Sequence, residues 1–240
     1  MEHPFHYLTD LLSTLVGMQL YLQSKVRDMV PEEKRLIVLI GALIGAVVGS
    51  RLVSALENPV LFLHPPALLY YYANKTIIGG IAGGILGVEF VKKLIGVREW
   101  TGDRVLVPLG VAIIIGRIGC FFTGVADGTV GGPCSYVWCL VQGDGIPRHP
   151  NSLYEIVLIL VLLGANFWYL RKHAIAHPLK PGVRFRFFIL AYFFLRFWIE
   201  FLKDTHPLLF ALNIIQWVCL GVFGWYLRDV VYALAPRQRT

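Results

Sequence analysis

The chain has 240 residues, of which 56% are hydrophobic and 15% are charged, with a formal net charge of +7. Its mean hydropathy of +0.63 is high for a soluble domain. The charged residues stand between long apolar segments rather than along amphipathic faces, which excludes most soluble folds. The basic residues flank these segments and form no continuous patch, so we expect no nucleic-acid partner.

Seven segments approach the roughly 20 residues that a helix needs to cross a bilayer. In chain order they cover residues 5–22, 36–56, 76–95, 105–122, 151–170, 185–202 and 209–232. The first is the weakest, since Asp10 and Gln19 interrupt it. It has no preceding basic region, so we expect no cleavable signal peptide. We predict an all-α polytopic membrane protein with about seven transmembrane helices in a single transmembrane domain, residues 1–240.

The distribution of Lys and Arg predicts the orientation of these helices. Most of these residues lie in the first, third and fifth connections and in the C-terminal tail, whereas the alternate connections contain only Lys75, Arg148 and Lys203. The positive-inside rule therefore places the N-terminus outside and the C-terminus in the cytoplasm. Residues 61–72 are too short to span the bilayer and too apolar for a free loop, which favours an interfacial or re-entrant segment.

Three arginines, Arg51, Arg117 and Arg196, lie within or at the end of apolar segments. In the predicted orientation all three fall in the outer half of the bilayer. A charged residue at the centre of a spanning helix costs about 2.5–3.5 kcal/mol on insertion scales, so each needs a partner or a wet cavity. Pairing along one helix explains one of them, because Arg196 and Glu200 are four residues apart. Three arginines in one leaflet favour a binding site for an anion.

Glycine recurs at every fourth position of the second and third segments. The repeats are Gly41, Gly45 and Gly49 on the second, and Gly79, Gly83 and Gly87 on the third, with Gly80 and Gly84 beside them. Such faces let helix backbones approach closely. A phosphate-binding loop is the less favoured alternative, because the Lys and Ser/Thr that complete it are missing.

The longest connection, residues 123–150, lies between the fourth and fifth predicted helices and is predicted to be on the extracytoplasmic side of the membrane. It is rich in glycine and has few charges, which favours a folded surface loop. It contains Cys134 and Cys139, which can pair in an oxidising compartment, although their spacing does not establish a disulfide. The four cysteines show no CxxC spacing, and we expect no metal and no cofactor.

Several short motifs follow one another at characteristic spacings. The fourth segment ends in GRIGCFFTG (116–124), followed by Asp127 and Gly128, and the fifth begins with RHPNSLYE (148–155). The second ends in GSR (49–51), and the sixth carries Tyr192 and then RFWIEF (196–201). Together these motifs resemble the prolipoprotein diacylglyceryl transferase family of bacterial inner membranes, over most of the chain.

The resemblance implies transfer of the diacylglyceryl group of phosphatidylglycerol to the thiol of a lipobox cysteine. The expected partners are phosphatidylglycerol or another anionic phospholipid and the signal peptide of a prolipoprotein. It implies that Arg117 and Arg196 bind the phosphate, with Tyr192 one helical turn before Arg196. His149 is the candidate base for the thiol, although a histidine before proline also orients the start of a helix. The other positions that match the family, which we assign to substrate binding, are Arg51, Gly119, Gly128, Tyr154, Glu155 and Glu200.

Three positions depart from the family pattern. Ile78 replaces a histidine, Cys120 an asparagine and Val125 a glutamate, while Lys75 is a candidate substitute for the histidine. A paralogue with a different acceptor therefore stays open, as does a non-catalytic phospholipid-binding or lipid/solute transport protein of the same fold. The sequence contains none of the internal repeats common in transporters. An assembly subunit, which would tolerate loss of the arginines, is a third alternative.

Overall fold

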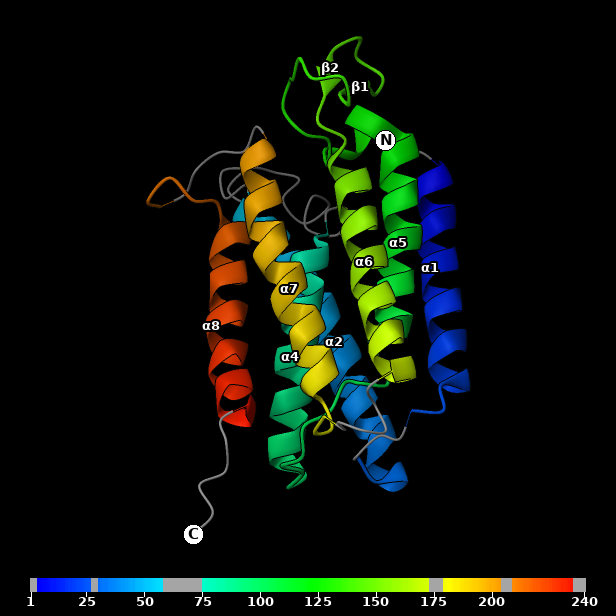
Figure 1. Cartoon of the computed structure of the whole chain (residues 1–240), viewed down its shortest axis with the longest axis vertical. Coiled ribbons are helices and arrows are strands. Elements are labelled where there is room, and N and C mark those ends of the chain that lie inside the picture. The colour runs from blue at the N-terminus through cyan, green and yellow to red at the C-terminus, as the bar shows by residue number, and fades with distance from the viewer. Residues whose placement is uncertain (1–3, 27–29, 58–74, 173–178, 204–208, 235–240) are drawn as a thin grey trace. The chain divides into compact units, whose positions relative to one another are not determined.

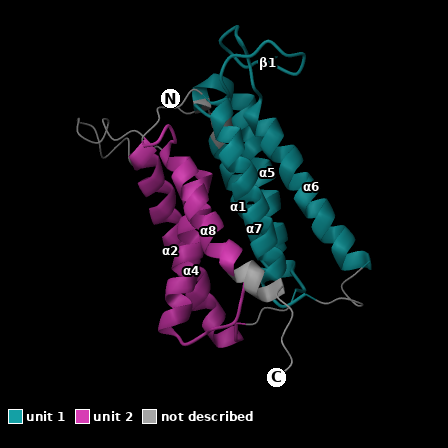
Figure 2. Cartoon of the chain, turned by 60° about the vertical axis from the view of Figure 1, so that its left-hand side comes forward, with its two compact units in different colours: residues 1–27, 102–204 teal, residues 28–101, 205–240 magenta. Residues whose placement is uncertain are grey.

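The computed structural model describes residues 4–26, 30–57, 75–172, 179–203 and 209–234, and these contain seven α-helices. The predicted interfacial segment, residues 61–72, lies outside the described residues. The chain divides into two compact units, which Figure 2 shows in different colours. The first comprises residues 1–27 and 102–204, and the second comprises residues 28–101 and 205–240.

The first unit contains α1 (Pro4–Gln23), α5 (Leu106–Thr123), α6 (Asn151–Lys172) and α7 (Val183–Ile199), labelled in Figure 1. Short 3-10 helices extend two of them: η2 (Gly124–Asp127) follows α5, and η3 (Glu200–Leu202) follows α7. Between α5 and α6 the chain forms a small antiparallel hairpin of β1 (Leu140–Val141) and β2 (Pro147–Arg148). The predicted loop between the fourth and fifth helices is therefore folded.

Close contacts fix the register of the helices around α5. A Cβ atom added at Gly119 would overlap the side chain of Thr9 on α1, and one added at Gly110 would lie 2.9 Å from Leu163 on α6. Glycine lets these helix backbones approach each other closely. Because Gly110 faces the far end of α6 while Arg117 contacts Glu155 near its start, α5 and α6 run antiparallel.

The segment before α5 holds the start of α7. The Asp103 carboxylate accepts hydrogen bonds from the backbone N–H groups of Gly182 and Phe185, both over 2.9 Å. An acidic side chain satisfies N–H groups that have no partner within the helix and interacts favourably with the helix dipole. This contact between distant parts of the sequence orients α7, the helix that carries Tyr192 and Arg196.

The second unit contains α2 (Glu32–Glu57), α4 (Ile77–Leu94) and α8 (Ile214–Leu234). The predicted glycine faces pack against each other: Cβ atoms added at Gly41, Gly45 or Gly49 would overlap the backbone of α4 around Gly87, Gly83 or Gly79. The backbones are so close that each position accepts only a residue without a side chain. The interpretation of these repeats as a packing face is confirmed.

Within the described residues, three helices are long and apolar enough to cross a membrane: Glu32–Glu57, Leu106–Ala126 and Asn151–Lys172. A shorter apolar helix covers Ile214–Arg228. Many apolar side chains on these helices are exposed, among them Leu43 on α2, Phe122 on α5 and Val161 on α6. Exposed apolar surface of this extent suits contact with lipid. All seven predicted segments contain a helix, and three of the helices meet both criteria.

The last helix begins later than predicted. The sequence predicts a helix from residue 209, but α8 starts at Ile214. Phe210 and Ala211 have positive φ angles of 50° and 59°, and Leu209 and Leu212 form an isolated bridge. Residues with a Cβ rarely adopt this conformation outside turns. The apolar character of residues 209–212 thus belongs to a turn before the helix.

Candidate functional site

An ion pair between α5 and α6 lies at the centre of the first unit. Arg117 donates to Glu155 through Nε over 2.9 Å and through Nη2 over 2.8 Å, both to the same oxygen, Oε2. Arg117 is 5% exposed and Glu155 is 1% exposed. A buried charge without a partner is strongly unfavourable, so each of these residues depends on the other.

Arg196 joins the same carboxylate from α7. Its Nε lies 3.4 Å from Glu155 Oε1, and its Nη1 lies 2.6 Å from Glu200 Oε2. The pairing of Arg196 with Glu200, predicted from their spacing of four residues, is confirmed. Glu155, however, bridges two arginines that come from different helices, which the spacing did not indicate. The carboxylate therefore fixes the two guanidinium groups relative to each other.

Tyr192 and Lys203 complete this ionic cluster. The Tyr192 hydroxyl donates to Glu155 Oε2 over 3.1 Å, and the ring is fully buried beside Phe188. Lys203 Nζ lies 3.7 Å from Glu200 Oε1. Among the described residues, the cluster thus joins Arg117, Arg196 and Lys203 to Glu155 and Glu200. Two buried guanidinium groups this close together suit an anionic ligand, since the interior screens charge poorly.

Cys120 lies one turn after Arg117 on α5. Its thiol is 3.9 Å from Arg117 Nη1, and the residue is buried. One residue before Arg117, Gly116 is also buried, yet a Cβ atom added there would meet no heavy atom of the described residues within 4 Å. Within this part of the chain, the backbone at Gly116 therefore borders open space.

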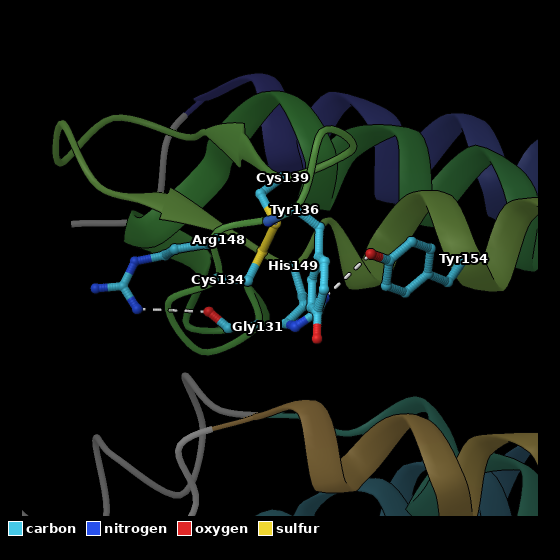
Figure 3. The surroundings of a disulfide bond; sticks show 7 residues. All are labelled: Gly131, Cys134, Tyr136, Cys139, Arg148, His149 and Tyr154. Carbon is cyan, nitrogen blue, oxygen red and sulfur yellow. Dashed lines mark hydrogen bonds between the residues drawn. A yellow bond between two sulfur atoms is a disulfide. The ribbon is translucent and has the colours of Figure 1, made fainter.

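The loop between α5 and α6 ends at His149, two residues before α6. His149 Nδ1 lies 3.2 Å from the Tyr154 hydroxyl, the contact drawn as a dashed line in Figure 3. The backbone of His149 is held at both ends, because Gly131 N–H donates to its carbonyl and its own N–H donates to Gly132. Gly132 N–H in turn donates to the Leu202 carbonyl over 2.7 Å, which ties the loop to the end of η3. His149 is thus in a fixed, half-buried position.

A disulfide joins Cys134 to Cys139 beside His149, as Figure 3 shows. The sequence left this pairing open, and the structure contains it. The two sulfur atoms and one imidazole nitrogen lie within 4.8 Å of one another, the spacing of a possible metal group. With both sulfur atoms in a disulfide, neither is a thiolate that can ligate a metal ion.

The same loop contains one ion pair with an effect on acidity. Arg148 Nε donates to Asp144 Oδ2 over 2.7 Å, and Ile146 N–H donates to Oδ1 of the same carboxylate. These hydrogen bonds, chiefly the one from Arg148, hold the pKa of Asp144 below its usual range. The charged carboxylate therefore holds the turn between β1 and β2.

Other predicted site residues lie elsewhere. Arg51 is half-buried near the end of α2 in the second unit, where Ile78 is buried on α4. Gly119 has a packing role against Thr9, and Gly128 adopts a positive φ of 67° in the turn after η2. Their predicted contacts with substrate stay predictions.

Sequence reasoning missed three residues near the predicted site. Lys203 enters the sequence analysis only as a residue of a connection, although its spacing of three from Glu200 indicates the contact. Cys120 appears there only as a departure from the family pattern, because its position beside Arg117 depends on side-chain geometry. Asn151 is 1% exposed at the start of α6, and nothing in its spacing distinguished it.

The helices and the ionic cluster define an α-helical protein with membrane-length apolar helices and a buried cluster of arginines and carboxylates. A model of the prolipoprotein diacylglyceryl transferase family matches residues 6–229, and the chain belongs to this family.

Three curated relatives are each named phosphatidylglycerol–prolipoprotein diacylglyceryl transferase. The protein of Bordetella parapertussis is 33% identical over 201 residues, which cover 75% of this chain and 70% of the relative. That of Methylococcus capsulatus is 34% identical over 170 residues, 68% of this chain and 62% of the relative. That of an Azoarcus species is 32% identical over 219 residues, 84% of this chain and 78% of the relative.

Proposed function

We propose that this protein transfers the diacylglyceryl group of phosphatidylglycerol to the thiol of a lipobox cysteine in a prolipoprotein. The observation that carries the proposal is the meeting of Arg117 and Arg196 at one buried carboxylate, in a chain of this family. The relatives are named for the same reaction. Guanidinium groups are well suited to phosphate because they donate two parallel hydrogen bonds.

The protein acts as a single transmembrane domain of the bacterial inner membrane, with seven transmembrane helices. Its N-terminus and the loop of residues 123–150 lie outside, and its C-terminus lies in the cytoplasm. The seven helices, three of them clearly long and apolar enough, support this arrangement, and the distribution of Lys and Arg supports the orientation. The signal peptide of the acceptor then reaches the site from the same membrane.

The reaction exchanges one bond for another at the glyceryl carbon. The thiol sulfur attacks the carbon that carries the phosphate, the carbon–sulfur bond forms, and the carbon–oxygen bond breaks. The electron pair of that bond leaves with glycerol phosphate, while the thiol proton passes to a base. Arg117 and Arg196 stabilise the charge that develops on the departing phosphate.

His149 is the proposed base. It lies at the start of α6, and its contact with Tyr154 orients the imidazole. Tyr192 contributes through its bond to Glu155, which keeps the carboxylate between the arginines. The proposed substrate-binding residues are Arg51, Gly119, Gly128, Tyr154, Glu155 and Glu200.

Transfer of labelled diacylglycerol from phosphatidylglycerol to a synthetic lipobox peptide tests the proposal. The comparison is between wild type and an Arg117→Lys/Arg196→Lys variant, which keeps both charges but loses the forked geometry. An Arg98→Lys/Arg171→Lys variant, changed at two exposed arginines, is the matched control. We expect a loss of roughly a hundredfold or more in the first variant and none in the second. A wild-type protein that transfers nothing to the peptide contradicts the proposal.

The tight pairing of both arginines favours one second candidate, a phospholipid-binding protein of the same fold without chemistry. In the structure each guanidinium already has a carboxylate partner, and Ile78 stands where the family has a histidine. This candidate predicts binding of phosphatidylglycerol without transfer to any lipobox peptide.

A further inference from the structure

Asn151, the first residue of α6, has a buried side chain with unsatisfied hydrogen-bonding groups. The residue is 1% exposed, and neither Nδ2 nor Oδ1 has a hydrogen-bond partner among the described residues. Its backbone N–H is satisfied by the His149 carbonyl over 2.9 Å, so the helix start itself does not need the side chain. Burial of an amide without hydrogen-bond partners is unfavourable. Such a group therefore calls for a partner from outside the chain, such as a ligand or an ordered water.

The position of Asn151 places it next to the ionic cluster. Asn151 and Glu155 are four residues apart on α6 and therefore on the same face, the face that meets Arg117. Since α5 and α6 run antiparallel, Asn151 lies one turn, about 5.4 Å, from the cluster towards the loop of residues 123–150. At this level α5 presents residues that follow Arg117, including Cys120.

We propose that Asn151 binds the glycerol headgroup of phosphatidylglycerol and selects this lipid among phospholipids. The inference rests on the proposed function, because it takes phosphate binding by Arg117 and Arg196 as given. With the phosphate at the arginines, the headgroup extends by several bonds, which suits a contact one helical turn away.

The chemistry of a carboxamide fits a diol. Nδ2 donates and Oδ1 accepts, and the hydroxyl groups of glycerol can accept the first bond and donate the second. The ammonium group of an ethanolamine headgroup only donates, so it would leave Nδ2 unsatisfied. Phosphatidic acid has no headgroup and would satisfy neither atom. A site built to hydrogen-bond a hydroxyl discriminates strongly against a ligand that lacks it.

The test compares binding of phosphatidylglycerol and phosphatidic acid with identical acyl chains to the purified full chain. We expect wild type to bind phosphatidylglycerol about tenfold more tightly or better. In Asn151→Ala the affinity for phosphatidylglycerol falls to that for phosphatidic acid, and the latter changes less than about twofold. Asn151→Leu, which keeps about the same size but loses both the donor and the acceptor, gives the same comparison if the alanine variant does not fold. Asn166→Ala, at the other end of α6, is the control and keeps the wild-type preference.

Two results overturn the inference: a preference that persists in both Asn151 variants, and an equal loss of affinity for both lipids, which indicates a structural role. A wild type without any preference overturns it as well. The proposed function is judged separately by transfer to the lipobox peptide. If the protein shows the Asn151-dependent preference but transfers nothing, the headgroup contact stands and the proposed reaction is contradicted.

Discussion

Arg117 on α5 and Glu155 on α6 are 38 positions apart in the chain, yet they form a buried ion pair of 2.8 Å. Arg196 and Tyr192 on α7 contact the same carboxylate. Glu155 therefore joins three helices of the first unit and holds together the groups that we assign to phosphate binding. Its removal should affect stability as well as activity.

Replacing Glu155 by glutamine should destabilise the protein. The side chain keeps its shape but no longer neutralises two buried arginines, and loss of one member of a buried ion pair costs about 3–5 kcal/mol. We expect a clearly lower midpoint of thermal unfolding in detergent. Glu99→Gln, at an exposed position, should leave the midpoint unchanged. Equal midpoints for the two variants would show that the ion pair does not support the fold.

A substitution at Gly83 should separate α2 from α4. A Cβ atom there would overlap the Gly45 carbonyl and lie 2.8 Å from the Gly49 Cα atom, so valine forces the helix backbones apart. Overpacking of this kind costs about 1–3 kcal/mol. The measurement is thermal unfolding of Gly83→Val beside Gly221→Ala on α8, where an added Cβ meets nothing within 4 Å. Identical stability of both variants contradicts the close packing.

His149→Gln should slow transfer while the protein stays folded. If the imidazole accepts the thiol proton, its loss lowers the rate by about 10²–10⁴-fold. Tyr154→Phe removes the hydroxyl that orients the imidazole through Nδ1, so it should also slow transfer, but less than loss of the base itself. Initial rates of transfer to the lipobox peptide provide the comparison. An undiminished rate in His149→Gln removes this residue as the base and leaves it the role of orienting α6.

The hairpin should depend on pH through Asp144. Because Arg148 lowers the pKa of this carboxylate in the folded loop, its contribution to stability is present above the usual aspartate pKa of about 3.9. It is lost as the pH falls through the lowered pKa. Limited proteolysis of the loop should therefore be slow at pH 5–8 and faster near pH 3. At neutral pH the protease should cleave the loop of Asp144→Asn faster than that of wild type. Equal resistance of the loop in both proteins would show that Asp144 does not stabilise the hairpin.

Contacts that a periodic pattern along a helix indicates could be predicted from the sequence. The pairing of Arg196 with Glu200 follows from a spacing of four residues, and the packing of α2 against α4 follows from glycine at every fourth position. These patterns depend on helix geometry alone. The existence of seven helices likewise follows from the length of the apolar segments.

Contacts between distant segments could not be predicted where no periodic pattern indicates them. The role of Glu155 as a bridge depends on how α5, α6 and α7 pack, and no local pattern encodes that arrangement. The Asp103 contact with the start of α7 is of the same kind. The predicted start of α8 was wrong for a different reason. Hydropathy carries no information on φ angles, and the apolar residues Phe210 and Ala211 form a turn instead of the first turn of the helix. The reciprocal cap between Asn213 and Gln216, three residues apart, was a readable signal of the true start.

The most direct measurement counts both products of one reaction. With phosphatidylglycerol labelled in its headgroup and in its diacylglyceryl group, the purified protein should form one thioether-linked diacylglyceryl peptide for each glycerol phosphate released. Both counts should fall together by roughly a hundredfold in Arg117→Lys, since the arginine acts on the departing phosphate. Release of glycerol phosphate without labelled peptide, or undiminished transfer in Arg117→Lys, would contradict the account.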